Sequence, residues 1–490
     1  MTTAEYVKKI DEVNEKGPFK PEWSSLCNFE MPQWFTKAKF GIFIHWGIYS
    51  VPAYNNEWYS RNMYVKDSDE YRHHIETYGP HKDFGYKDFI PMFKAEKFDP
   101  SAWADLFKKA GAKYVVPVAE HHDGFQMYDS ELSEWNAVRK GPCRDVIGEL
   151  KKEIEKRDMV FATSSHRAEH QWFMGNGRDF ESDICGEMTP ADFYWPSLQK
   201  QPDQSSITDT PNVDEEYGND WLARTAELID KYHPAILYFD WWIQHVSWKP
   251  YLKKIAAYYY NCGLTWGQNV GICYKHDAMM FGSGIVDVER GKLSVPKSYH
   301  WQTDTAIAHN SWCYTTNLMY KTPYDILVYL IDIVSKNGNL LLNVGPRADG
   351  TIPEKDTEIL ESIGKWMEVN GEGIYNSRVW RFAEEGPTSE HEGQFSDGAK
   401  EYTAEDFRFT VGNGYLYAFC LKYPENGCIT IKSLADTTDQ NLPLFHGIVD
   451  NVEALGFDEK VEFTKDGSGL HIRTKGVSSE LPVVFRITLR

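Results

Sequence analysis

One acidic residue, Asp240, ends an apolar run and stands among aromatic side chains. It follows the β-prone segment ILYF and precedes Trp241 and Trp242. A carboxylate among aromatic rings loses hydration, so it is rarely found there without a partner or a chemical task. Such a group suits the nucleophile of a glycoside hydrolase, which attacks the anomeric carbon of a sugar in a site that excludes water. A structural role, with backbone amides holding the carboxylate, is the alternative.

A glycoside hydrolase also needs a second carboxyl group, which gives a proton to the leaving oxygen. Glu289 is our candidate because it ends the short β-rich run IVDVE. Arg290 and Gly291 follow it and suggest the start of an exposed loop. Asp287, two residues earlier, is the rival. The residues themselves leave the choice between the two acids open.

Three further segments combine histidines with a glutamate and aromatic residues. They read GIFIHWG (41–47), NEWYSRNMY (56–64) and AEHHDGF (119–125). The first puts His45 and Trp46 at the mouth of a strand. We expect no metal, because adjacent residues of a strand point to opposite sides, so His121 and His122 would not share one ion, and no HExxH spacing occurs. Neutral imidazoles and carboxylates are instead good partners for the hydroxyl groups of a polyhydroxy compound.

Helices that lead into apolar strands recur along the first 375 residues. In one such unit, Asp99 and Pro100 begin a helix that runs into a strand over residues 114–119. Polar residues follow at least five strands, at His45, His121, His166, Asp240 and Lys275. Polar groups at the carboxyl ends of many strands are typical of a (β/α)8 barrel, whereas an open doubly wound sheet gathers its ligands at one crossover point. We therefore predict an α/β fold with a (β/α)8-like barrel.

From about Tyr375 the pattern changes to short β-rich segments separated by Gly, Asn, Asp and Pro. This spacing predicts an antiparallel β-sandwich over residues 376–490, appended to a catalytic barrel over residues 1–375. We expect the sandwich to brace the barrel, because its sequence does not concentrate exposed aromatic residues.

The overall charge excludes some classes of partner. The formal net charge is -20, whereas proteins that bind nucleic acid or an anionic membrane need a basic patch, so we expect neither partner. No run approaches the roughly 18 apolar residues of a membrane helix. The first residues carry acidic groups and no apolar core of a secretory signal. We expect a cytoplasmic protein as written, or a secreted one if a signal has been trimmed.

Six segments follow one another in a recognisable order. They are GIFIHWG, EWYSRNMY, EHHDGF, the Asp240 strand before a Trp, WQTDTAIAHNSWCY (301–314) and NLLLNVGPRADGTIP (339–353). Together they resemble the α-L-fucosidases of glycoside hydrolase family 29, over about residues 30–375. The resemblance implies a retaining exo-enzyme, without a cofactor, that removes terminal α-L-fucose from fucosylated glycans. A retaining glycosidase of another sugar and a non-catalytic fucose-binding relative are the alternatives.

The resemblance also implies roles for single residues. It makes Asp240 the nucleophile and Glu289 the acid/base. It places seven side chains around the sugar: His45, Glu57, Trp58, His121, His122, Tyr238 and Trp312. This chain departs from the family's pattern at Cys313, where a Gly is usual, and at His166, Glu169 and His170, where other members carry a Tyr or different residues. Contacts to the aglycone are expected from long loops such as residues 178–214.

Overall fold

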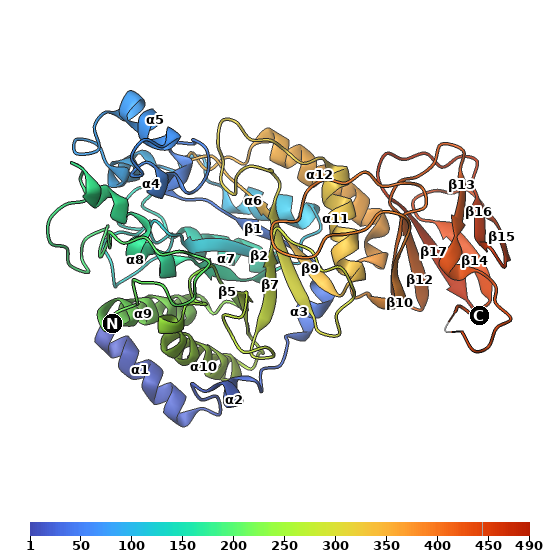
Figure 1. Ribbon diagram of the computed structural model, residues 1–490, viewed down its shortest axis with the longest axis horizontal. Coiled ribbons are helices and arrows are strands. Elements are labelled where there is room, and N and C mark those ends of the chain that lie inside the picture. Colours follow the sequence, from blue (N-terminus) through green and yellow to red (C-terminus); the bar gives the residue numbers. More distant parts are fainter. Residues whose placement is uncertain (443) are drawn as a thin grey trace.

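The computed structural model describes residues 1–442 and 444–490, and its first part is a closed barrel of parallel strands (Figure 1). The strands are β1 (Phe40–Ile44), β2 (Tyr114–Glu120), β3 (Val160–Phe161), β4 (Thr163–Ser165), β5 (Ile236–Phe239), β6 (Gly271–Lys275), β7 (Ile285–Glu289), β8 (Trp301–Ala306) and β9 (Gly338–Val344). Because β3 and β4 both pair with β2, they occupy one strand position. β1 pairs with β2 and with β9, which closes the ring. The predicted (β/α)8-like barrel is confirmed.

Helices cover the outside of the barrel. The larger ones are α1 (Thr3–Lys16), α5 (Asp69–Tyr78), α6 (Pro100–Lys109), α7 (Val146–Glu155), α9 (Glu215–Tyr232), α10 (Lys249–Trp266), α11 (Pro323–Ser335) and α12 (Glu354–Asn370), and the short ones are α2 (Trp23–Leu26), α3 (Gln33–Ala38), α4 (Tyr59–Asn62) and α8 (His170–Phe173). α1 packs on α9 and α10 (Figure 1). Asp99 caps α6 as predicted, since its carboxylate accepts from the backbone N–H groups of Ser101 and Ala102. In the described part of the chain, no helix is long and apolar enough to cross a bilayer.

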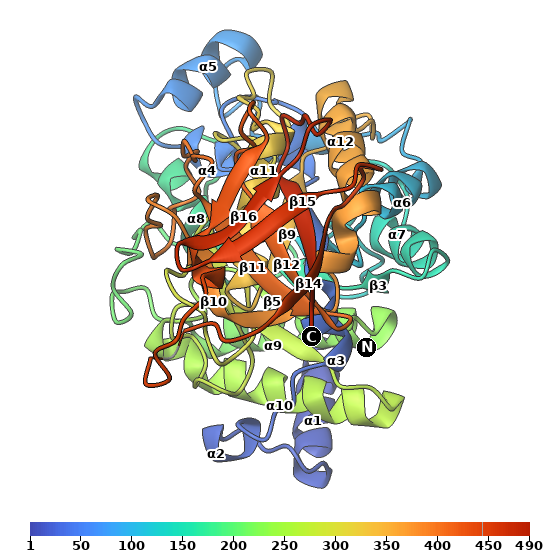
Figure 2. The same cartoon turned by 90° about the vertical axis from the view of Figure 1, so that its right-hand side faces the viewer.

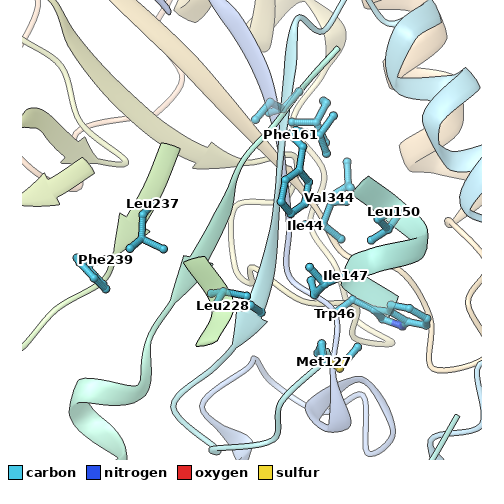
Figure 3. Close-up of a cluster of buried hydrophobic side chains, with 14 of the residues drawn as sticks. Ile44, Trp46, Met127, Ile147, Leu150, Phe161, Leu228, Leu237, Phe239 and Val344 are labelled. Carbon is cyan, nitrogen blue, oxygen red and sulfur yellow. The ribbon is translucent and has the colours of Figure 1, made fainter. Parts of the chain in front are cut away.

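Side chains along each barrel strand point alternately outward, toward the helices, and inward, toward the barrel interior, and so form two apolar layers. Outward side chains such as Ile44, Phe161 and Val344 pack under the helices (Figure 3). Trp46 joins this outer layer, where it packs against Trp103 and donates its indole N–H to a backbone carbonyl. The expectation that the Trp46 indole lies beside His45 at the mouth of the strand is therefore wrong, because Trp46 turns outward to Trp103 whereas the His45 ring packs on Phe43 inside the barrel.

The second part of the chain is a pair of antiparallel sheets. One contains β10 (Arg378–Glu385), β11 (Phe407–Gly412), β12 (Tyr415–Cys420), β17 (Val483–Leu489) and β14 (Val449–Ala454), and the other contains β13 (Cys428–Ile431), β16 (Gly469–Arg473) and β15 (Glu462–Asp466). Figure 2 shows β15 and β16 in front of β11 and β12. A core shared by both sheets, with Phe409 and Phe485 from one and Ile429 and Ile472 from the other, makes this a β-sandwich, as predicted.

Buried charges join the two parts. α11 lies against β10 and β11, and Asp332 of α11 accepts from Lys336 at 2.8 Å and from Arg408 of β11 at 2.5 Å. All three side chains are almost fully buried. The segment from 386 to 406, between β10 and β11, returns to the barrel, where Gly393 pairs with Lys292. We call this segment the strap.

Candidate active site

A cavity of about 730 Å³ lies at the carboxyl ends of the barrel strands. It brings together all nine residues predicted to act on or hold a sugar: His45, Glu57, Trp58, His121, His122, Tyr238, Asp240, Glu289 and Trp312. Its floor is the interior of the barrel, which is filled by side chains such as Tyr114 and Gln302, joined by a 2.8 Å hydrogen bond. The cavity is therefore blind at its inner end.

Lys275, at the end of β6, bridges the two carboxylates. Its ammonium donates to Asp240 Oδ1 at 2.7 Å and to Glu289 Oε2 at 2.6 Å. These two distances place the carboxylate oxygens no more than 5.3 Å apart. Carboxyl groups are roughly 5–5.5 Å apart in retaining glycosidases and roughly 6.5–9.5 Å apart in inverting ones. The separation suits direct attack by one carboxylate and leaves little space for a water molecule between the pair.

The surroundings of the two carboxyl groups push their pKa values apart. Burial alone would raise the pKa of Asp240, but the Lys275 ammonium and His166 hold it well below its usual range. Burial raises the pKa of Glu289 to about 7, and the negative charge of Asp240 adds to the increase while Lys275 opposes it. Near neutral pH, Asp240 is ionised and Glu289 carries a proton in a large share of the molecules.

Two histidines also hold the Asp240 carboxylate. Nδ1 of His166 and Nε2 of His122 both lie 3.1 Å from Asp240 Oδ2. Burial lowers the pKa of His166, so its imidazole is neutral and donates Nδ1–H to Asp240 while Nε2 accepts from Ser164. For His122, burial opposes protonation, but the carboxylates of Glu169 and Asp240 raise its pKa. Asp240 thus faces hydrogen-bond donors on both of its oxygens.

A second pair of histidines lines the cavity beside this group. Nδ1 of His45 lies 2.6 Å from Oδ1 of Asn343, and His121 stacks near His166 with ring centroids 4.8 Å apart. Burial lowers the pKa values of His45 and His121 well below the usual range, so both rings are neutral. Within the described part of the chain, Nδ1 of His121 is buried and has no hydrogen-bond partner. Neutral rings with free nitrogen atoms suit hydroxyl groups, which donate and accept.

Glu57 and two tryptophans complete the wall of the cavity. The Glu57 carboxylate accepts from the backbone N–H of Trp312 at 3.0 Å. The Trp312 ring lies 5.2 Å from His45, and Arg290 stacks 4.6 Å from its centroid. Trp58 lines the same cavity, with its ring centroid 6.0 Å from that of His122. These contacts fix the rings and the carboxylate before a ligand arrives.

Profiles of known families match both parts of the chain. One described as Alpha-L-fucosidase matches residues 6–372, and one described as Alpha-L-fucosidase C-terminal domain matches residues 400–490. The chain belongs to the α-L-fucosidase family.

Relatives and solved structures in this family cover most of the chain. The tissue α-L-fucosidase of Rattus norvegicus is 30% identical over 464 residues, which are 91% of this chain and 86% of that protein. The plasma α-L-fucosidase of Homo sapiens is 31% identical over 451 residues, which are 88% of this chain and 85% of that protein. The crystal structure of Thermotoga maritima α-fucosidase matches with a TM-score of 0.75 at 30% identity, over 96% of this chain and 100% of that one. A structure of that fucosidase in complex with fucose matches with a TM-score of 0.73 at 31% identity, over 96% of this chain and 100% of that one.

The positions of Asp287 and Glu289, the two candidates for the acid, differ in the structure. Asp287 points into the barrel, where its carboxylate accepts from Gln302 at 2.8 Å and from Tyr238 at 3.4 Å. It does not line the cavity, whereas Glu289 does. Trp241 donates its indole N–H to Glu289 Oε2 at 2.5 Å. The position of Glu289 favours it over Asp287 as the group that reaches a leaving oxygen.

Two local expectations are wrong. Arg290 and Gly291 do not begin an exposed loop, because the strap covers them and both are buried. His121 and His122 do not point to opposite sides, because β2 ends at Glu120 and strand alternation stops there. Their rings lie 4.5 Å apart, and both line the cavity.

The histidines also offer possible metal ligands. Ligand atoms of His45, His121 and His166 lie within 4.8 Å of one another, as do those of His122, His166 and Asp240. Both sets need His166, whose two nitrogen atoms already bond to Asp240 and Ser164. A metal would have to break one of these bonds, so metal-independent catalysis stays our prediction.

The sequence pointed only weakly to several residues of this site. Lys275 was recognisable as a polar residue after a strand, but nothing in its segment indicated that it bridges two carboxylates. The sequence marks His166 as a polar residue after a strand and as a departure from the family pattern. The strap residues Gln394 and Phe395 also line the cavity, and no local signal connects them to it.

Proposed function

We propose that this protein is a retaining exo-α-L-fucosidase that hydrolyses terminal α-L-fucose from fucosylated glycans. The observation that carries the proposal is the pair Asp240 and Glu289, held by one ammonium within 5.3 Å of each other and differing in protonation. Membership of the α-L-fucosidase family supports the choice of sugar. The blind cavity supports exo action, because it has room for the end of a glycan but no exit for a continuing chain.

The cavity wall suits a 6-deoxy sugar. Phe43 lies 5.0 Å from Tyr238 and 6.3 Å from Trp312, ring centroid to ring centroid. These three rings form an apolar face suited to a methyl group, while His45, His121 and Glu57 offer partners to hydroxyl groups. A sugar with a hydroxymethyl group would leave its hydroxyl unpaired against the rings.

The reaction proceeds by double displacement. Asp240 Oδ attacks C1, the bond from C1 to the leaving oxygen breaks, and Glu289 gives its proton to that oxygen. The product is a fucosyl ester of Asp240, whose negative charge has disappeared. Loss of this charge lowers the pKa of Glu289, which then takes a proton from water. The water oxygen bonds to C1 and releases Asp240, so two inversions give net retention.

One set of assays tests the proposal. Release of the chromophore from an aryl α-L-fucoside, with NMR detection of α-fucose as the first product, is the expected outcome. Asp240→Gly should abolish turnover, and azide should partly restore it by forming β-fucosyl azide. Full activity of Asp240→Gly, or β-fucose as the first product, would contradict the mechanism.

The same assays separate the alternatives. A panel of other aryl glycosides tests a different sugar, and absence of any turnover in the presence of fucose binding would indicate a non-catalytic relative. The ionised Asp240 beside a protonated Glu289 disfavours the second alternative, because binding alone needs no such pair. Loss of activity with a chelator, restored by a divalent metal, would refute metal independence.

A further inference from the structure

The strap attaches the C-terminal part of the chain directly to the loop after β7. Lys292 and Gly393 exchange two backbone hydrogen bonds of 3.2 and 2.9 Å. The backbone N–H of Phe395 donates to the carbonyl of Glu289 at 2.9 Å. A residue of the second domain is thus bonded to the backbone of the acid/base candidate.

Ion pairs hold the strap on both sides of this contact. Before it, Glu390 is buried and pairs with Lys292 and Lys400, both at 2.9 Å. After it, Asp397 accepts from the buried Lys321 at 2.6 Å. Because buried pairs are costly to break, the segment between them has a defined position.

Two residues of this segment are not explained by packing. Phe395 is 63% exposed and has φ +53°, a left-handed conformation that is unfavourable for a bulky residue. Oε1 of Gln394 is buried without a partner among the residues that the structure describes. Both residues line the cavity. An exposed aromatic ring and an unpaired amide oxygen at the mouth of a sugar site indicate a ligand rather than a structural role.

The position of the leaving group in the proposed reaction indicates which part of the substrate Phe395 and Gln394 face. Glu289 must protonate the leaving oxygen, so the departing group lies next to Glu289. Trp241 contacts the Glu289 carboxylate and Phe395 contacts its backbone. Ile207, from the loop over residues 178–214, is 56% exposed and lines the same cavity. These apolar side chains border the path by which the aglycone leaves.

We propose that Phe395 and Gln394 determine specificity for the sugar to which fucose is attached. The Phe395 ring packs against the C–H face of this pyranose, and Gln394 Oε1 accepts a hydrogen bond from one of its hydroxyl groups. The inference rests on the proposed α-L-fucosidase activity. It gives the C-terminal domain a part in substrate recognition, beyond bracing the barrel.

The test compares two substrates that differ only in the leaving group. A fucosylated disaccharide carries the pyranose that Phe395 is proposed to contact, whereas α-L-fucosyl fluoride loses a single atom. Phe395→Asn removes the ring and suits the left-handed backbone. We expect kcat/KM for the disaccharide to fall about tenfold, equal to about 1.4 kcal/mol, with no change for the fluoride. Gln394→Ala should act in the same direction.

Phe281→Asn is the matched control, because Phe281 is 58% exposed and does not line the cavity. It should leave both substrates unaffected. Unchanged disaccharide hydrolysis by Phe395→Asn, or an equal loss on both substrates, would overturn this inference while the fucosidase proposal stands. Failure of the unmodified protein to cleave either substrate would instead overturn the proposed function.

Discussion

Replacing Lys275 by Met should move the pH profile of the enzyme to higher pH. The side chain keeps its length and loses its charge, so Asp240 and Glu289 are left facing each other without a cation. Like charges disfavour double ionisation, and one of the two groups then retains a proton, as in a carboxylate dyad. Both pKa values must rise, because the ammonium stabilises only the ionised forms.

The expected size of the pH shift follows from the distance between Lys275 and Glu289. Lys275 lies 2.6 Å from Glu289 Oε2, and an opposite charge at close range shifts a carboxyl pKa by about one to three pKa units. The pKa of Glu289 is raised to about 7 with Lys275 present. Since Glu289 must be protonated to act as the acid, the alkaline limb of kcat/KM should move from near pH 7 to about pH 8–10. The acid limb should also move upward as Asp240 becomes easier to protonate.

The assay is the pH dependence of kcat/KM for an aryl α-L-fucoside, measured on the protein and on Lys275→Met. Lys336→Met is the matched control, since Lys336 is also buried and paired with a carboxylate, Asp332, but lies outside the cavity. Its profile should keep the original limbs even if its stability falls. An alkaline limb that stays near pH 7 in Lys275→Met would refute the assignment of Lys275 as the group that lowers the Glu289 pKa.

Three further substitutions test Glu289, its indole partner, and the buried ion pairs between the barrel and the sandwich. Trp241→Phe removes the indole N–H that bonds Glu289 and should raise the alkaline limb by about one pH unit; a limb that falls would contradict this. Glu289→Gln should abolish the alkaline limb and slow disaccharide hydrolysis about 10²–10⁴-fold, with a much smaller loss on an activated aryl fucoside, and equal losses would indicate another acid. Asp332→Ala removes the carboxylate shared by the buried cations Lys336 and Arg408, which keep Glu384 and Glu390 as carboxylate partners. It should lower the free energy of unfolding by about 3 kcal/mol in urea titrations, while Glu358→Ala, in an exposed pair, should not; equal effects would argue against the buried network.

The sequence predicted the barrel because its strands and helices follow local rules. Asp99 and Pro100 begin α6 where the capping pattern places them, and polar residues follow the strands that meet at one end of the barrel. The nucleophile candidate was recognisable for the same reason, since a carboxylate among aromatic residues at a strand end is locally unusual.

Such local rules do not predict contacts between segments that are distant in the sequence. The bridge from Lys275 to Asp240 and Glu289 depends on the pairing of β6 with β5 and with β7, which sets the distance between three strand ends. The choice between Asp287 and Glu289 needed the depth of each side chain in the barrel, because both lie on the same face of β7 and, of the two, only Glu289 reaches the cavity. The prediction that Arg290 is exposed fails because a segment about a hundred residues later covers it. No residue near Arg290 in the sequence indicates this contact.

The strap also has a consequence for the order in which the protein matures. A chain emerging from the ribosome can pair β9 with β1 once residue 344 is available, but the loop after Glu289 stays uncovered until Phe395 and Asp397 have been made. The nascent barrel would thus carry its nucleophile and its proton donor while that loop lacks its cover. Completion of the cavity lining, to which Gln394 and Phe395 belong, becomes a late event in synthesis, tied to arrival of the second domain.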